Sequence, residues 1–287
     1  MNYGLPYMGS KSRICEWLMA HLPPAETFVD LFAGGCAVTH AALLSGRYQH
    51  FLANDIQGEY PRLFLRLATE GLKPEEFYPV SREEFEFRKA ADPLIRLVWS
   101  FGNNEKKGYL YANELEPLKL VAHEMCVASS VMKRYTAYRK FIKMLVDASQ
   151  EFDLRLFSIE RLDRLKQLQS LGALDRLKQL CVLGGDYRNI KIPENSTVYA
   201  DPPYAGTAKY SSGVFNHAEF YDWLRHVQHP VYVSEYAMPD DFVCVAETEL
   251  KSILGSNNKS VIERLFLHER FAERHETMNL FKPEDFL

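Results

Sequence analysis

This 287-residue chain lacks the sequence features of disulfide-linked, metal-binding, membrane-spanning and secreted proteins. Its five cysteines (Cys15, Cys36, Cys126, Cys181 and Cys244) are odd in number and scattered, without the paired spacing that binds a metal. A dispersed set of this kind favours reduced thiols over a disulfide framework. No apolar run approaches the length that crosses a bilayer, and the N-terminus lacks the apolar core of a signal peptide. The sequence therefore predicts a soluble cytoplasmic protein with no membrane anchor and no metal site.

A large excess of charge of either sign is also lacking. Lys and Arg number 34 against 38 Asp and Glu, which gives a net charge of −4. The chain as a whole would not be attracted to nucleic acid, so any surface that binds DNA or RNA must be a local patch. Hydrophobic residues make up 47% of the chain and charged residues 25%, as in ordinary globular proteins. A chain of this length can form one large α/β domain, or one domain with an insertion.

Both ends of the chain alternate between expected strands and helices. A buried strand over 27–32, a glycine turn, a helix over 36–45 and a strand over 51–53 form a βαβ unit, which predicts a parallel sheet with right-handed crossovers. Near the C-terminal end we expect strands over 197–200 and 231–234, and a helix over 216–227 capped by Asn216 and Glu219. Two further strands, 242–253 and 261–268, flank a hairpin-turn sequence at 255–258. The sequence predicts an α/β fold that ends in an antiparallel hairpin.

The middle of the chain interrupts this alternation. From residue 57 to about 153 the pattern is helical, with a capping box at 81–84, a polar loop over 100–114 and a helix over 131–149. Leucine or isoleucine then recurs at every third residue over 156–183. A spacing of three drifts by about 60° per step around an α-helix, so we expect short helical pieces broken near Gly172. We therefore expect an α/β domain of 1–56 and 184–287 and a helical insertion of 57–183, in which 156–183 is a connector.

The stretch from Val198 to Tyr204 has the pattern of a buried strand that ends in a rigid turn. In Asp201-Pro202-Pro203-Tyr204 the prolines fix φ and restrict the residue before each of them. A carboxylate, two carbonyl groups and an aromatic ring are thus held at the C-terminal end of a strand, where open α/β sheets bind ligands. Taken alone, this stretch also fits an acidic turn without a function.

An acidic residue also lies on the first expected strand and another just after the second. Asp30 precedes Ala33-Gly34-Gly35, where the backbone can be approached closely, and its carboxylate suits a cationic ammonium group. The Gly-x-Gly-x-x-Gly pattern of dinucleotide-binding proteins is absent. Asp55 lies about 20 residues after the glycines, where a carboxylate can hold ribose hydroxyls, although a turn residue is an equal alternative.

Weaker candidates lie in two loops. Asp186 follows Gly184-Gly185 and could present a carboxylate to an adenine amino group, with an ordinary turn as the alternative. Tyr7 and Lys11 lie among small residues in the N-terminal loop, and a lone lysine of this kind is usually a solvated charge.

Four motifs, taken in order, resemble those of the Dam-type DNA N6-adenine methyltransferases. They look like motifs X, I, II and IV of that family: Tyr-Met-Gly-Ser-Lys at 7–11, Phe-Val-Asp-Leu-Phe-Ala-Gly-Gly at 28–35, Asn-Asp-Ile at 54–56 and Asp-Pro-Pro-Tyr at 201–204. Their order is that of the alpha group. The resemblance covers roughly 5–56 and 186–268. It implies a Rossmann-like sheet that binds S-adenosylmethionine (AdoMet), with a helical inserted target-recognition subdomain. The leucine-triplet run is not part of the family pattern.

The resemblance implies a cofactor role for eight residues. Tyr7 and Lys11 would contact the carboxylate end of AdoMet, and Asp55 would bind its ribose hydroxyls. Asp186 matches the position that contacts the adenine of the cofactor. The methionine portion would be cradled by Asp30, Phe32, Ala33 and Gly34. The product would be S-adenosylhomocysteine.

The resemblance also implies that Asp201, Pro202 and Tyr204 hold the target adenine. The Asp201 carboxylate and the Pro202 carbonyl would accept the two hydrogens of the N6 amino group and stabilise its developing positive charge. Tyr204 would stack on the base, which must be flipped out of the duplex. Transfer would be direct and in line, with no covalent enzyme intermediate and no metal.

The remaining candidates would contact double-stranded DNA. The expected helix over 131–149 is basic and aromatic, and its charges suit phosphates, although a solvated helix face is an equal alternative. The polar loop carries side chains able to read base edges, and the loop after Tyr204 could close over the flipped base. The candidates are Lys133, Arg134, Arg139 and Lys140 on the helix, Asn103, Asn104, Lys106 and Lys107 on the polar loop, and Lys209 and Tyr210 after the turn.

Three functions remain open from the sequence. The first is site-specific methylation of adenine N6 in DNA. The second keeps AdoMet but transfers its methyl group to an RNA base, to cytosine N4 or to a protein amide, because related turns serve these reactions. The third is a DNA- or AdoMet-binding protein without turnover, which is disfavoured because every chemically necessary position is filled. We expect a monomer in solution, with a dimer on DNA as the alternative, in a bacterial or phage-infected cell. Regulatory, restriction-partner and phage-protective roles are all compatible with the first function.

Overall fold

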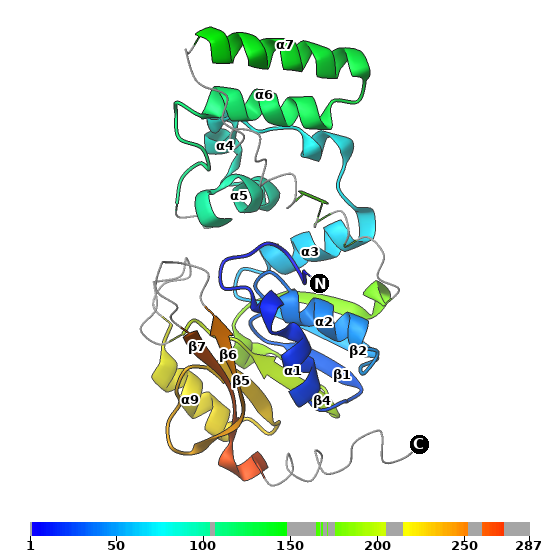
Figure 1. The fold of residues 1–287 in the computed structure, drawn as a ribbon. Helices are drawn as coiled ribbons and strands as arrows, with labels where there is room; N and C mark the ends of the chain where they lie inside the picture. Colours follow the sequence, from blue (N-terminus) through cyan, green and yellow to red (C-terminus); the bar gives the residue numbers. More distant parts are fainter. Residues whose placement is uncertain are drawn as a thin grey trace. The chain divides into compact units, whose positions relative to one another are not determined.

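The chain forms two compact units in a computed structural model, drawn in Figure 1. The structure describes residues 2–103, 107–147, 165–166, 168, 171, 176–204, 215–251 and 260–272. The first unit comprises Met1–Gly4, Lys11–Arg62 and Asp175–Leu287, and the second comprises Leu5–Ser10 and Leu63–Leu174. Helix α3 (Glu59–Glu70) contributes residues to both.

A seven-stranded sheet is the centre of the first unit, within the described residues. Its spatial order is β3-β2-β1-β4-β5-β7-β6. Strands β1 to β5 run parallel, whereas β7 is antiparallel to both β5 and β6. The strands are β1 (Thr27–Asp30), β2 (His50–Asp55), β3 (Leu180–Gly184), β4 (Ser196–Ala200), β5 (Val231–Glu235), β6 (Phe242–Lys251) and β7 (Ser260–His268). The predicted Rossmann-like α/β fold with a terminal antiparallel hairpin is confirmed.

Helices cover both faces of this sheet (Figure 1). Side chains alternate along a strand, so Val29 and Asp30 of β1 face opposite sides. Val29 packs in a buried cluster with Phe220 and Leu224 of one helix, and Asp30 accepts a hydrogen bond from Thr39 of another. The helices of this unit are α1 (Cys15–His21), α2 (Ala37–Ser45) and α9 (His217–His226), with short 3₁₀ helices η1 (Lys11–Arg13), η5 (Leu177–Gln179) and η6 (Tyr187–Asn189).

The ends of the helices follow the signals in the sequence. Helix α2 ends at Gly46, whose φ of 72° suits a residue without a side chain. The Asn216 side chain accepts a hydrogen bond from the N–H of Glu219 (3.2 Å) and so caps α9 as predicted. Helix α1 ends just before Pro23, which cannot continue a helix.

The leucine-triplet run departs from the prediction at its C-terminal end. We expect helical pieces over 156–183, but Leu180–Gly184 is strand β3, in which Leu180 pairs with Phe51 and Gly184 with Asp55 of β2. A spacing of three matches neither the period of a helix nor that of a strand, so pairing with a neighbouring strand decides the local structure. Leu165, Leu168 and Leu171 are buried, and most of the preceding run lies outside the described residues.

The second unit is helical where the structure describes it, as the pattern predicts. Ser81 caps the helix that follows it, because its hydroxyl accepts a hydrogen bond from the N–H of Glu84 (3.2 Å). Helices α6 and α7 pack side by side through Leu118 and Phe141 among others (Figure 1). No helix in the described part of the chain is long and apolar enough to span a membrane. The remaining elements are α4 (Arg82–Arg88), α5 (Pro93–Trp99), α6 (Glu116–Val127), α7 (Val131–Asp147), η2 (Pro74–Phe77) and η3 (Phe101–Asn103).

Candidate active site

The strand order reverses between β1 and β4. The chain passes from β1 to β2 and β3 on one side, and then returns to β4 on the other side of β1. In open parallel sheets, ligands bind beyond the C-terminal ends of the strands at such a reversal. Asp30 ends β1 beside Tyr199 of β4, and Asp201 directly follows β4. Two of the acidic residues chosen from the sequence therefore lie at this point.

An acidic residue stands at the end of each of four adjacent parallel strands. In spatial order these are Asp55 as the last residue of β2, Asp30 as the last residue of β1, Asp201 directly after β4 and Glu235 as the last residue of β5. Asp30 and Glu235 are each only 1% exposed. Glu235 was not among the residues chosen from the sequence, although it directly follows the expected strand over 231–234, as Asp201 follows the expected strand over 197–200. This edge of the sheet is suited to cationic groups.

Asp30 has one oxygen paired and one oxygen without a partner. Its Oδ2 accepts a hydrogen bond from the Thr39 hydroxyl (2.7 Å), whereas its buried Oδ1 has no hydrogen-bond partner among the described residues. Burial raises the pKa of Asp30 to about 7, and the Thr39 hydrogen bond opposes this rise. A buried polar atom without a partner costs free energy, so a ligand N–H that reached Oδ1 would be stabilised.

The glycine turn after β1 is fastened to the end of β2. The N–H of Gly34 donates to Asp55 Oδ2 (3.2 Å), and the N–H of Ala33 donates to the carbonyl of Asn54 (2.7 Å). The Asn54 side chain donates to the carbonyls of Leu31 and Gly185 (3.0 Å each) and so joins the segments after β1 and β3. The sequence analysis missed this role of Asn54. These bonds hold the glycine turn beside Asp55.

Lys11 contacts the Asp-Pro-Pro-Tyr turn directly. Its Nζ lies 3.0 Å from Asp201 Oδ1 and 4.4 Å from the centroid of the Tyr204 ring. Burial raises the pKa of Asp201 to about 6, and the Lys11 ammonium lowers it in opposition. The lysine that the resemblance assigns to the cofactor thus contacts the carboxylate that it assigns to the target amine.

Tyr204 is held by residues of the C-terminal hairpin region. Its hydroxyl donates to Glu263 Oε2 on β7 (2.7 Å), and the ring of Tyr236 meets it edge-on with centroids 4.6 Å apart. Burial raises the pKa of Tyr204 far above its usual range, so its hydroxyl remains a donor. Glu263 was not among the residues chosen from the sequence, because an acidic residue in the alternating pattern of an amphipathic strand is expected to face solvent.

Three further expected cofactor residues, Asp186, Phe32 and Tyr7, also have partners within the protein. The Asp186 carboxylate accepts from the backbone N–H of Arg188 (2.9 Å) and from its guanidinium Nε (3.0 Å), and these hydrogen bonds lower its pKa. The Phe32 ring packs against Tyr187 and Phe220, with centroids 5.2 and 5.6 Å away. Tyr7 lies in the second unit, where its N–H donates to the carbonyl of Leu5 (2.8 Å).

The structure describes six of the ten candidates for DNA contact. Lys133, Arg134, Arg139 and Lys140 are all exposed on α7. Asn103 ends η3, and Lys107 is exposed with its Nζ 5.6 Å from the centroid of the Phe101 ring. The other four lie outside the described residues: Asn104, Lys106, Lys209 and Tyr210.

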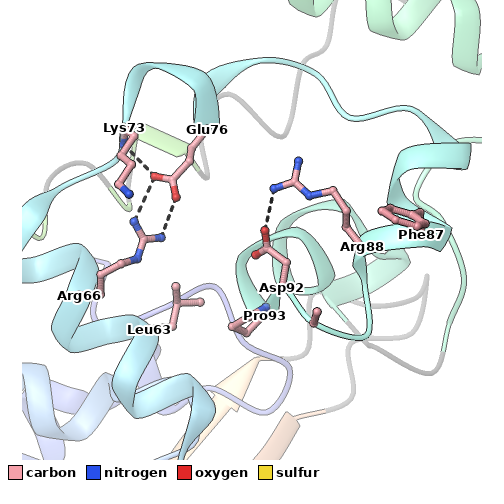
Figure 2. Close-up of a pocket in the computed structure, with 9 residues that line it drawn as sticks. Leu63, Arg66, Lys73, Glu76, Phe87, Arg88, Asp92 and Pro93 are labelled. Atoms are coloured by element: carbon pink, nitrogen blue, oxygen red, sulfur yellow. Dashed lines mark hydrogen bonds and ion pairs between the residues drawn. The ribbon is translucent and has the colours of Figure 1, made fainter.

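A separate pocket lies within the second unit and is shown in Figure 2. Its volume is about 600 Å³. Two ion pairs on its wall join Arg66 to Glu76 (3.0 Å) and Arg88 to Asp92 (2.9 Å). It contains none of the residues expected to act in catalysis or to bind a cofactor. Its lining consists of Leu63, Arg66, Lys73, Glu76, Phe87, Arg88, Ala91, Asp92 and Pro93.

A comparison with protein families gives an independent result. The family model described as D12 class N6 adenine-specific DNA methyltransferase matches residues 7–226, which is more than half of the chain. The matched range includes Lys11, Asp30, Asp55, Asp201 and Tyr204.

Proposed function

The chain belongs to the D12 class N6 adenine-specific DNA methyltransferase family and is an adenine-specific DNA methyltransferase; we propose that it transfers the methyl group of AdoMet to an adenine flipped out of double-stranded DNA. The observation that carries this proposal is the position of the Asp201–Tyr204 turn. It lies at the reversal of the strand order, next to the strand that ends in Asp30. A carboxylate for the reacting amine and a carboxylate for the cofactor would thus be neighbours.

The residues at the ends of β1 and β2 fit a cationic cofactor. We propose that Asp30 Oδ1 accepts from the ammonium group of AdoMet, because it is a buried acceptor without a partner among the described residues. Asp55, fixed by the Gly34 N–H, suits the ribose hydroxyls, and the backbone of 32–34 would line the methionine portion. When bound, AdoMet supplies a methyl group activated by an adjacent sulfonium.

Lys11 can serve both the target and the cofactor. The Lys11 ammonium forms an ion pair with Asp201 Oδ1 at 3.0 Å. We propose that Lys11 also contacts the carboxylate end of AdoMet, for which Tyr7 remains a second proposed contact. Asp186 remains the proposed contact to the cofactor's adenine, and it would have to share its oxygens with Arg188.

The turn provides what a weak nucleophile needs. The lone pair of the adenine N6 amine is delocalised into the ring, so the amine attacks poorly. We propose that the Asp201 carboxylate and the Pro202 carbonyl accept its two hydrogens, which favours a pyramidal nitrogen and stabilises its developing positive charge. Nitrogen would be the attacking atom, and no group of the chain would become covalently modified. Holding nitrogen and methyl carbon in near-attack geometry would supply much of the acceleration.

The target base must leave the DNA helix to reach this turn. An amino group inside a duplex is inaccessible to the turn, so we propose that the adenine flips out at a cost of a few kcal/mol. Tyr204 would then contact the base, with its ring fixed by Glu263 and Tyr236. Lys209 and Tyr210, which follow the turn in the sequence, are proposed to close over the flipped base or the backbone.

Helix α7 carries the proposed contacts to DNA phosphates. Its Ala137, Phe141 and Leu145 pack against α6, so its four proposed cations project from the exposed part of its surface. Phosphates attract such cations regardless of sequence, whereas base edges carry the sequence information. We propose that Asn103 and Lys107, together with Asn104 and Lys106, which lie between them in the sequence, read base edges within this helical recognition region.

Methyl transfer from labelled AdoMet tests the proposed function. The protein is incubated with duplex DNA, single-stranded DNA, RNA or a protein mixture, and the product is digested to nucleosides or amino acids. We expect label in duplex DNA, recovered as N6-methyladenine. Label recovered in RNA, as N4-methylcytosine or in protein would contradict the proposal. Mapping the methylated adenines in treated genomic DNA would then identify the recognition sequence.

A further inference from the structure

The Asp201–Tyr204 turn has few groups by which the protein can hold it. Pro202 and Pro203 lack an N–H, so over these two residues the backbone offers only carbonyl acceptors. In the proposed function, the Pro202 carbonyl binds the target amine. Of the two proline carbonyls, only that of Pro203 then remains to bind a donor from the protein. Such a donor would fix the orientation of the turn and so affect the rate of methyl transfer.

His217 supplies this donor. Its Nε2 lies 2.8 Å from the carbonyl oxygen of Pro203. A carbonyl oxygen can only accept, so Nε2 must carry the hydrogen, and in the neutral ring Nδ1 is then the acceptor nitrogen. Glu235 Oε1 lies 3.9 Å from the same Nε2, and an oxygen acceptor on that side also favours a hydrogen at that nitrogen.

His217 is itself held in place. It is the first residue of α9, and the Asn216 cap fixes the helix at that point. The Phe215 ring meets the imidazole edge-on with centroids 5.0 Å apart, and the following Phe220 is fully buried in the core. The bond to Pro203 thus ties the turn to a helix that is anchored on the sheet.

We propose that His217 is a positioning residue for methyl transfer, through its Nε2–H bond to the Pro203 carbonyl. Because φ is fixed at both prolines, holding the Pro203 carbonyl restricts the direction of the preceding Pro202 carbonyl. Asp201 is joined to the same rigid unit, so both acceptors keep a common direction toward the target amine. This inference rests on the proposed function of the turn.

Three variants separate positioning from a purely structural role. His217→Phe keeps a ring against Phe215 but removes the donor, whereas His217→Gln keeps a donor. His226→Phe is the matched control, because His226 lies on the same helix with an exposed side chain bonded only locally to Asp222 in the described structure. We expect His217→Phe to lower kcat about tenfold, or about 1.4 kcal/mol, with KM for AdoMet unchanged. His217→Gln should recover most of this loss, and His226→Phe should leave kcat unchanged.

Turnover by His217→Phe at the rate of the unchanged protein would overturn the inference, as would a His217→Gln variant as slow as His217→Phe. A measurement that needs no turnover distinguishes this inference from the proposed function. Long-range ¹H–¹⁵N NMR correlations report the tautomer of each histidine ring, and His217→Gln identifies the His217 signal. We expect the Nε2–H tautomer, and the Nδ1–H tautomer would overturn the inference. Absence of methyl transfer to DNA by the unchanged protein would instead contradict the proposed function.

Discussion

At the scale of single residues, the two buried carboxylates Asp30 and Asp201 differ in what surrounds them. Asp30 accepts from a neutral hydroxyl, and burial raises its pKa to about 7. Asp201 is buried too, but the Lys11 ammonium limits the rise of its pKa to about 6. At neutral pH the carboxylate at the target site is therefore more fully ionised than the carboxylate at the proposed cofactor site.

The first prediction concerns the acid limb of the pH–rate profile. Asp201 accepts hydrogens from the amine only as a carboxylate, and that form is lost as the pH falls through about 6. Single-turnover rates with bound DNA and AdoMet should fall below that pH. Lys11→Met removes the cation that lowers the pKa of Asp201, so this limb should move to higher pH. Lys11→Arg, which keeps the charge, should move it less. If the acid limb of the pH–rate profile moved to lower pH in Lys11→Met, this would contradict its assignment to the ionisation of Asp201.

The second prediction concerns Asp30, where stability and binding should oppose each other. Its folded pKa of about 7 lies above the ordinary value of 3.8 for an aspartate, so the folded state binds the proton more tightly than the unfolded state. The stability contributed by this group is present below about pH 4 and falls as the pH rises to 7. Asp30→Asn should thus raise the free energy of unfolding at pH 8 by up to about 4 kcal/mol and weaken AdoMet binding. Denaturant unfolding and calorimetric titration measure the two effects, and tighter AdoMet binding would refute the proposed role.

At the scale of elements, the sequence predicts structure wherever a local pattern decides it. The buried strands β1, β2, β4 and β5, the caps of α4 and α9 and the terminal hairpin all follow from periodicity and capping residues. Strand β3 does not, because its leucine spacing has no regular period and pairing with β2 determines its form.

To predict the contacts at the candidate site, one must also know the order of the strands in the sheet. Lys11 meets Asp201, and Tyr204 meets Glu263, only because β4 lies between β1 and β5 with β7 beyond. Acidic residues at strand ends can be found from the sequence, since each lies next to its strand. The donor to Pro203 could not be found in this way, because His217 is remote from the turn along the chain and lies within an ordinary amphipathic helix.

The third prediction tests the packing of the N-terminal segment on the glycine turn. Gly4 has a φ of +64°, and a Cβ there would clash with the Gly35 carbonyl oxygen and lie 2.6 Å from the Ala37 backbone nitrogen. Gly4→Ala should therefore lower the free energy of unfolding by well over 1 kcal/mol, because backbone must move. Gly46→Ala is the matched control, since its φ is +72° but a Cβ would meet nothing within 4 Å. Equal losses in the two variants would refute the close contact.

At the scale of the whole molecule, DNA can bind only where positively charged side chains are concentrated on one part of the surface. The chain carries a net charge of −4, so the exposed cations of α7 would have to outweigh a weak general repulsion. Binding through phosphates has a measurable consequence, because each neutralised phosphate releases counterions and steepens the dependence of affinity on salt.

The fourth prediction follows from that salt dependence. Lys133→Glu with Lys140→Glu should weaken binding to duplex DNA and reduce the slope of log affinity against log salt concentration by about 2. The control is Lys178→Glu with Lys191→Glu, which changes the net charge equally at two exposed lysines of the first unit. Fluorescence anisotropy over a range of salt concentrations measures both. If the two double variants changed DNA affinity and its salt dependence equally, α7 would not be part of the DNA interface.

The single-turnover rate of methyl transfer to adenine in duplex DNA tests the central claim most directly. Asp201→Ala removes the carboxylate proposed to bind the N6 amine, and Asp240→Ala removes an exposed carboxylate as the control. We expect the rate to fall by about 10²–10³-fold in Asp201→Ala, the size of effect seen when one transition-state-stabilising group is lost. AdoMet binding, measured by calorimetry, should be retained in both variants. Methylation by Asp201→Ala at the rate of the unchanged protein would contradict the claim that this turn activates the target amine.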